Sequence, residues 1–280
     1  RPAITMLKDG FEKIEKDPNV NIPLFFQSGI KAIDKVIHDF HEEGEKGSGT
    51  TMVAVITEEN RLYWASVGDS RIYLLRGDEI KLVTRDHNYY LRLMQMVENG
   101  SMTKEEAMRH RQKEALISFL GIGNVKLMDV IDKPLEMQTG DMVLLCSDGV
   151  TKTLSKDRIK MILKNDAVSM QKKAEILVEA AVRENTHSQD NTSVALLQYI
   201  ETKITKERYK MKKEYEYSTK VKDINFFINY DKMSTKVLTL KVLPLPAEHP
   251  HHCNLTIQNL PQISNLKVLS CLPLLVFLRY

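Results

Sequence analysis

Cysteine is scarce in this chain, which has only Cys146, Cys253 and Cys271 among its 280 residues. Three scattered thiols are too few for a disulfide framework or for a four-cysteine zinc site. The first residues also lack the charged and then apolar pattern of a signal peptide. We therefore expect a protein of a reducing compartment, the cytoplasm.

Long apolar runs are missing as well, and so is any separated block of one charge. The longest apolar run, Val268 to Leu278, falls short of the roughly 20 residues that a membrane helix needs, so we expect no membrane span. Residues 201–280 hold 13 Lys and Arg against 7 Asp and Glu, which leaves residues 1–200 at −3 within a total of +3. Both signs are interleaved through 201–232, without the cationic stripe typical of nucleic-acid binding, so we predict no nucleic-acid partner.

The first half of the chain changes from a helical to a strand-like pattern near residue 50. Apolar residues from Ile30 to Phe40 recur at spacings of three and four, which is typical of an amphipathic helix. Segments rich in β-branched and aromatic residues follow, namely residues 51–57, 61–67, 71–76 and 79–83. The pattern predicts an antiparallel meander with turns at Glu59-Asn60, Gly68-Asp69 and Gly77-Asp78.

Helical and strand-like segments alternate between residues 88 and 200. Helices are predicted on either side of Gly100-Ser101 and over residues 155–163 and 169–185, with strands at 126–131, 142–147 and 192–200. Strands joined by hairpins and interleaved with helix pairs favour an α+β fold, an antiparallel β-sandwich flanked by helix pairs.

The patterning decays after Ile200 into mixed charge followed by Pro244, Pro246 and Pro250. We place one domain in residues 1–200 and a basic, poorly patterned tail in residues 201–280, which we expect to be disordered or aberrant. His249, His251, His252 and Cys253 lie in this tail and are assigned to a solvated segment rather than to a metal site.

Three acidic motifs stand beside apolar strand-like runs: Gly68-Asp69-Ser70-Arg71, Cys146-Ser147-Asp148-Gly149 and Gln189-Asp190-Asn191-Thr192-Ser193. Carboxylates at strand ends can converge on one hard cation such as Mg²⁺ or Mn²⁺, so metal-dependent hydrolysis is the leading hypothesis. Asp, Gly and Asn are also ordinary turn formers, and taken alone Asp148-Gly149 and Asp190-Asn191 more often indicate structural loops than metal ligands. Asp69 is assigned to a tight hairpin, and His87, beside Asp86, to a structural role.

Cys146 raises the alternative of a cysteine-dependent phosphatase, which needs an Arg six positions later in its phosphate loop. That position holds Lys152. Cys146 also ends the apolar run from Met142 to Leu145, where burial raises the pKa of a thiol instead of lowering it. We therefore predict a small core residue.

Six motifs in order carry a resemblance to a known family. They are Gly47-Ser48-Gly49-Thr50-Thr51, Val67-Gly68-Asp69-Ser70-Arg71, Thr84-Arg85-Asp86-His87, Leu120-Gly121, Ser147-Asp148-Gly149 and Asp190-Asn191-Thr192-Ser193. In order and spacing the chain resembles the type 2C metal-dependent serine/threonine protein phosphatases (PPM-type), and the bacterial branch is the most similar. The likeness covers residues 47–199.

The resemblance implies a four-layer α-β-β-α sandwich with two Mn²⁺ or Mg²⁺ ions and a looser third. Asp148 and Asp190 match metal ligands, Asp86 matches the ligand of the third ion, and Gly149 at the metal site would let the backbone turn sharply after the strand. The implied reaction is attack of a metal-activated water on phosphoserine or phosphothreonine in proteins. Phosphoproteins and an opposing serine/threonine kinase are the implied partners, and a complete chain is expected to be a monomer.

One expected motif is missing. The family's Asp-Gly-x-Gly-Gly, whose Asp bridges two metals, should precede Gly47, and only Asp9-Gly10, followed by Phe11, stands there. The arginine that binds the substrate phosphate is missing too. We expect the domain to be N-terminally incomplete, with its first strands missing. The alternative is a non-catalytic, phosphatase-like binding or regulatory module.

Overall fold

A computed structural model describes residues 6–7, 9–11, 20–39, 49–58, 60–184 and 192–200, together with the strand residues 225–230, 236–240, 268–271 and 274–279. The chain forms two compact units. The first comprises Arg1–Ile72, Leu82–Leu135 and Asn265–Tyr280, and the second comprises Tyr73–Lys81 and Glu136–Ser264. No helix in the described ranges has the length and apolar character needed to cross a membrane.

The first unit is built on a sheet with the strand order β11-β12-β1-β2-β5, in which β6 also pairs with β2. The bounds are β1 Thr51–Glu58, β2 Arg61–Val67, β5 Asp129–Val130, β6 Leu135–Glu136, β11 Val268–Cys271 and β12 Leu274–Arg279. Strands β1 and β2 form an antiparallel hairpin from Met52 opposite Val67 to Glu58 opposite Arg61. Nearly all of β1 is buried, as its apolar residues at both odd and even positions predict.

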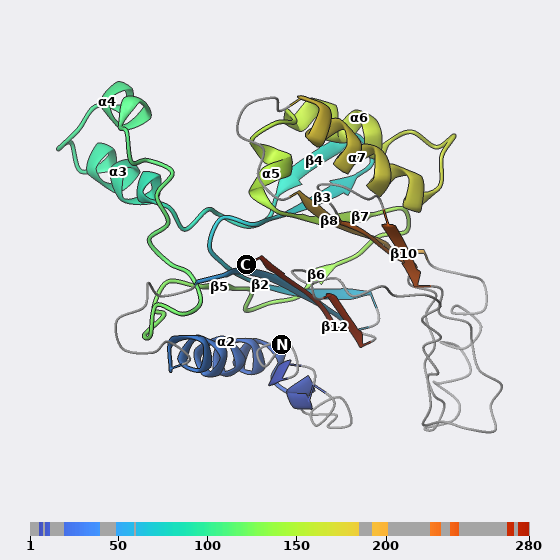
Figure 1. The fold of residues 1–280 in the computed structure, drawn as a ribbon, viewed down its shortest axis with the longest axis horizontal. Coiled ribbons are helices and arrows are strands. Elements are labelled where there is room, and N and C mark those ends of the chain that lie inside the picture. The colour runs from blue at the N-terminus through green and yellow to red at the C-terminus, as the bar shows by residue number, and fades with distance from the viewer. Residues whose placement is uncertain are drawn as a thin grey trace. The chain divides into compact units, whose positions relative to one another are not determined.

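Helix α2 (Ile22–Asp39) covers this sheet (Figure 1). Its buried Phe26, Ile30 and Ile33 share one core cluster with residues of β1 and β2 such as Met52 and Ala65. The spacing of three and four between these apolar side chains turns one stripe of the helix toward the sheet. The amphipathic helix expected from Ile30 onward is therefore confirmed, although it begins earlier.

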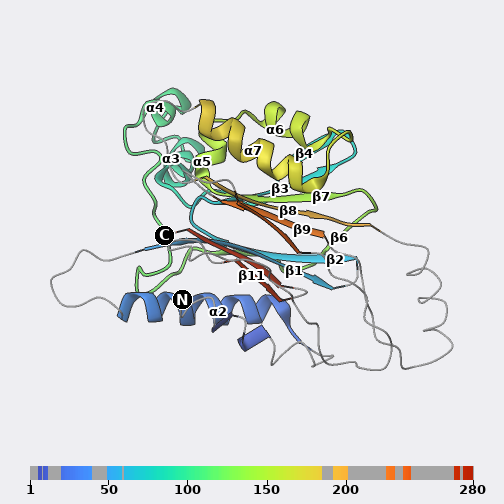
Figure 2. The same cartoon turned by 45° about the vertical axis from the view of Figure 1, so that its right-hand side comes forward.

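The second unit contains the sheet with the order β10-β9-β8-β7-β3-β4. The bounds are β3 Arg71–Arg76, β4 Glu79–Leu82, β7 Met142–Cys146, β8 Ser193–Gln198, β9 Asn225–Tyr230 and β10 Lys236–Leu240. Three helices lie over it, α5 (Asp148–Thr151), α6 (Lys156–Leu163) and α7 (Met170–Glu184), as Figure 2 shows. Leu144, Leu163, Leu177 and Leu196 belong to their shared core.

Every strand pair with a defined register is antiparallel, and each sheet carries its own helices. The α+β class and the antiparallel sheets predicted from the sequence are thus confirmed. Parts of the 201–280 segment take part in both sheets. Strand β9 pairs with β8 from Ser193 opposite Tyr230, and β12 pairs with β1 from Thr51 opposite Arg279.

One predicted turn is wrong. Strands β2 and β3 belong to different sheets, so Gly68-Asp69 is not a hairpin but the connection by which the chain changes sheets. Gly68 has a φ of 101°, and a Cβ at this position would collide with the side chain of Thr51. A Gly-Asp pair between two apolar strands is compatible with either connection, because the local sequence does not specify which neighbour a strand pairs with.

The short helices on either side of Gly100-Ser101 form as predicted, α3 over Tyr89–Glu98 and α4 over Lys104–Arg109. Thr103 caps α4 with a capping box, in which Glu106 donates its backbone N–H to Thr103 Oγ1 and accepts the backbone N–H of Thr103. This device explains how a six-residue helix begins at a defined residue.

Candidate active site

Asp148 stands where strand β7 ends and helix α5 begins. All five residues of β7 are buried, and the residue itself is 5% exposed. Its Oδ2 accepts a hydrogen bond from Lys152 Nζ at 2.6 Å, one helical turn later. A carboxylate at the first turn of a helix is also favoured by the backbone N–H groups there. The fold thus holds a buried negative charge at a fixed place.

The residue before Asp148 ties this strand end to the start of β8. Ser147 donates its backbone N–H to Ser193 O at 3.1 Å, and Ser193 donates its backbone N–H to Ser147 Oγ at 3.0 Å. Ser193 follows Asp190 by three positions in the sequence. Asp190 itself lies outside the described residues, so its predicted role as a metal ligand stays a prediction.

Gly149 does not make the sharp turn that we expected. It is buried within α5, and its carbonyl oxygen accepts a hydrogen bond from Thr153 Oγ1 at 2.9 Å. The turn prediction failed because Ser147 has the extended backbone of an N-cap, so that the helix starts directly at Asp148. The change of direction takes place before Gly149.

Asp86 belongs to the first unit, and Arg71 holds it. Arg71 donates from Nε to Asp86 Oδ1 at 2.8 Å and from Nη2 to Oδ2 at 2.6 Å. This two-pronged geometry is the strongest form of a carboxylate–guanidinium contact. Sequence reasoning singled out both residues but not their pairing, because they stand on separate motifs and only the fold brings them together.

His87 is fully buried and supports the segment that carries Asp86. Its Nδ1 accepts the backbone N–H of Gly68 at 3.1 Å, and its own backbone N–H donates to Gly68 O at 2.9 Å. Because Nδ1 is an acceptor, the neutral ring carries its proton on Nε2, which lies 3.4 Å from Asp129 Oδ1. The structural role predicted for His87 is confirmed.

Asp129 is the acidic residue that contacts both His87 and Arg85. Burial opposes ionisation of its carboxyl group, but the contact with the His87 ring and the hydrogen bonds from Arg85 outweigh burial and hold the pKa of Asp129 below its ordinary value. Arg85 donates from Nε to Oδ1 at 2.9 Å. A depressed pKa means that the ionised carboxylate stabilises the folded chain.

The Asp129→Asn variant is therefore expected to unfold more easily at neutral pH, by about 1–2 kcal/mol for the loss of charged hydrogen bonds. Because the folded pKa is lowered, this contribution is complete above the unfolded-state value of about 3.9 and is lost as the pH falls through the folded pKa. Urea unfolding at pH 7 and pH 3 measures it. Asp132→Asn, on an exposed residue nearby, is the control. An Asp129→Asn deficit of equal size at both pH values would contradict the assignment.

A buried aspartate that the sequence analysis missed organises the loop after Leu120. Asp34 of α2 is 2% exposed. Its Oδ1 accepts the backbone N–H groups of Gly121 at 2.8 Å and Gly123 at 3.2 Å, and its Oδ2 accepts that of Val125 at 2.9 Å. The signal was present, because Asp34 follows Ile30 by four positions and so shares its buried face.

The described residues can be tested as metal ligands. Within the described ranges, no three side chains of His, Cys, Asp and Glu lie close enough together to hold an ion. Asp148 fits one ligand of a Mg²⁺ or Mn²⁺ site, since its buried carboxylate contacts a flexible ammonium group, 50% exposed, that can move away. Asp86 fits less well, because a metal there must displace the bidentate Arg71.

Cys146 lies fully buried in the core of the second unit. The prediction of a core residue is confirmed, and the cysteine-phosphatase alternative lacks an accessible thiolate.

Comparisons with known proteins give one consistent result. A family model for protein phosphatase 2C matches residues 6–93. The chain is 33% identical over 180 residues to the serine/threonine phosphatase stp of Listeria innocua, an alignment that spans 63% of this chain and 68% of that protein.

Solved structures agree. The serine/threonine phosphatase of S. agalactiae superposes with a TM-score of 0.61 at 28% identity, over 71% of this chain and 79% of that one. The catalytic domain of the serine/threonine protein phosphatase PstP, in complex with two manganese ions, matches with a TM-score of 0.52 at 27% identity, over 69% and 78%.

Proposed function

Because the chain belongs to the protein phosphatase 2C family, we propose that it removes phosphate from phosphoserine and phosphothreonine in proteins by metal-dependent hydrolysis. The observation that carries this proposal is the 33% identity to a serine/threonine phosphatase over more than half of both chains. The structure adds a buried carboxylate, Asp148, at the end of a core strand.

We assign the metal site to Asp148 and Asp190, with Asp86 for a third ion and Gly149 in the supporting backbone. Support for the pair Asp148 and Asp190 comes from the reciprocal hydrogen bonds between Ser147 and Ser193. Ser147 directly precedes Asp148, and Ser193 follows Asp190 by three positions. The phosphatase domain is assigned to residues 1–200, and the 201–280 segment extends its sheets through the pairs β8–β9 and β1–β12.

Mn²⁺ or Mg²⁺ is the proposed cofactor, two ions with a looser third, supported by the two manganese ions of the PstP structure. When bound, such ions lower the pKa of a water molecule and neutralise charge on the phosphoryl group. Asp148 holds its carboxylate on rigid elements, where little motion is lost on binding an ion. Lys152 offsets the cost of burying that carboxylate without metal.

Phosphoproteins are the proposed substrates, with a serine/threonine kinase that acts on the same proteins. We further propose that the complete protein is a monomer. We also propose that it works in the cytoplasm, since the three scattered cysteines suit a reducing compartment.

Metal removal tests the proposal. The intact chain is expected to release inorganic phosphate from a phosphothreonine peptide in millimolar Mn²⁺, to lose this activity in excess EDTA, and to regain it when Mn²⁺ or Mg²⁺ is added back. The same peptide with phosphotyrosine is the specificity control. Activity that survives EDTA, or no phosphate release in any metal, would contradict the proposed reaction.

A further inference from the structure

Two adjoining hollows lie on the first unit beside the loop that Asp34 holds. One has a volume of about 240 Å³ and is lined by residues of α3 and of the 117–127 segment. The other has about 410 Å³ and reaches to Gln27 and Lys31 of α2. Both are lined by Asn124, Val125 and Lys126, so they adjoin along this segment and are together called the basic groove below.

The charge of the basic groove has one sign. Arg92, Lys126 and Lys31 line it, whereas no Asp or Glu does among the lining residues that the structure describes. None of the three cations forms an ion pair with a described residue. Unpaired cations that line two adjoining hollows favour an anionic occupant.

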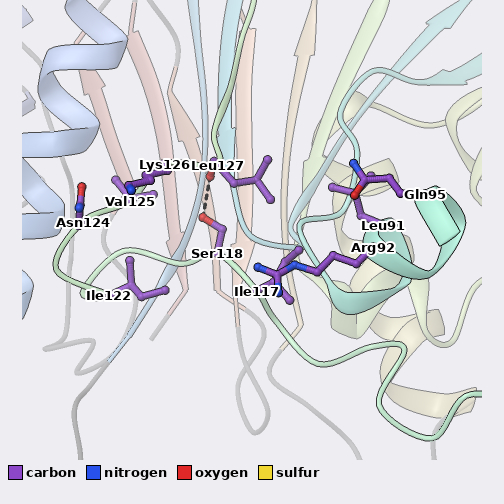
Figure 3. A pocket seen from close by; sticks show the side chains of 10 residues that line it. All are labelled: Leu91, Arg92, Gln95, Ile117, Ser118, Ile122, Asn124, Val125, Lys126 and Leu127. Atoms are coloured by element: carbon purple, nitrogen blue, oxygen red, sulfur yellow. Dashed lines mark hydrogen bonds between the residues drawn. The ribbon is translucent and has the colours of Figure 1, made fainter. Parts of the chain in front are cut away.

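The remaining lining is of the kind that suits a polypeptide. In Figure 3 the Arg92 side chain extends from α3 toward Ile117, and Ile122 lies on the loop opposite. Ile122 is 43% exposed, which leaves apolar surface available for a side chain. Gln95 and Asn124 add amide groups that can pair with a peptide backbone.

The floor of the groove is preformed. Asp34 fixes the N–H groups of Gly121, Gly123 and Val125, and Ser118 Oγ donates to Leu127 O at 2.6 Å. A site held in this way loses little conformational entropy when a ligand binds. Its two volumes each accommodate a few side chains, so an extended segment can lie along the groove.

We propose that the basic groove binds an acidic stretch of polypeptide in the phosphoprotein substrate, outside the phosphorylated residue itself. The identification of this ligand as substrate rests on the proposed phosphatase function. The groove therefore selects substrates whose phosphorylation sites are accompanied by Asp and Glu.

Fluorescence polarisation with a labelled, unphosphorylated peptide rich in Asp and Glu tests binding without any catalysis. The double variant Arg92→Ala with Lys126→Ala is expected to bind it about tenfold more weakly than the wild type, since each exposed charge contact contributes modestly. Added salt should weaken wild-type binding as well. The matched control is Arg109→Ala with Lys35→Ala, which removes an exposed Arg and an exposed Lys outside the groove.

The outcomes separate the two proposals. Equal affinity of both double variants for the acidic peptide, or equal wild-type affinity for its Asn and Gln counterpart, would overturn the groove assignment. So would stronger competition by an RNA oligonucleotide than by the peptide. If acidic binding depends on Arg92 and Lys126 but no phosphopeptide is hydrolysed in Mn²⁺, the groove stands and the phosphatase function fails. If phosphopeptides are hydrolysed, the KM advantage of acidic over neutral ones should vanish in the Arg92→Ala, Lys126→Ala variant alone.

Discussion

Replacing Asp148 by asparagine is expected to lower kcat/KM for a phosphothreonine peptide by about 10²–10³-fold. A metal ligand contributes several kcal/mol to the stabilisation of charge in the transition state, and each 1.36 kcal/mol or so is a factor of ten. Asparagine keeps the shape of the side chain but removes the charge that binds the cation. Phosphate release in saturating Mn²⁺ measures the loss.

The fold of the Asp148→Asn variant should survive, because the substitution keeps the volume of a buried side chain and the partner Lys152 is half exposed. Thermal melting checks this. Asp157→Asn, on an exposed position of α6, is the matched control and should retain wild-type kinetics. An Asp148→Asn variant with wild-type kcat/KM would remove Asp148 from the site.

The largest effect on stability is expected from Asp34→Ala. This variant leaves the buried N–H groups of Gly121 and Val125 without their acceptor, and the partly buried N–H group of Gly123 as well. Each unsatisfied buried donor costs about 1–3 kcal/mol, so the free energy of unfolding should fall by about 3 kcal/mol or more. Urea unfolding at pH 7 measures the difference.

Asp39→Ala is the control for this prediction, because Asp39 is an exposed aspartate at the end of the same helix. It should change stability by less than about 0.5 kcal/mol. A similar small change in Asp34→Ala would show that the three N–H groups find other partners. Asp34→Ala should also bind the acidic peptide more weakly than the wild type, since Asp34 holds the floor of the basic groove.

Local sequence patterns predicted the elements of this fold well. The apolar run from Met142 to Leu145 forms the buried strand β7. The periodic apolar residues of α2 form the face of that helix that packs into the core. Both signals depend only on the repeat of a single element, 2.0 residues for a strand and 3.6 for a helix. The order of the six motifs was equally informative, because it predicted the family from the sequence alone.

What the sequence did not predict depends on contacts between distant residues. Gly68-Asp69 resembles a hairpin turn, yet the strands on either side pair with different sheets. Asp-Gly at 148–149 resembles a turn, yet the N-cap conformation of Ser147 starts a helix there. The pairing of Arg71 with Asp86 follows from no local rule. In each case tertiary packing decides between the alternative local structures, and a short stretch of sequence does not specify that packing.

Direct binding of Mn²⁺, measured by isothermal titration calorimetry without any substrate, tests the central claim that Asp148 belongs to the metal site of a phosphatase. The wild-type chain and Asp157→Asn are expected to bind the ion with the same affinity. Asp148→Asn should bind it at least about tenfold more weakly, because hard divalent cations depend on carboxylate ligands. Identical isotherms for all three proteins, or no binding by the wild type, would contradict the account.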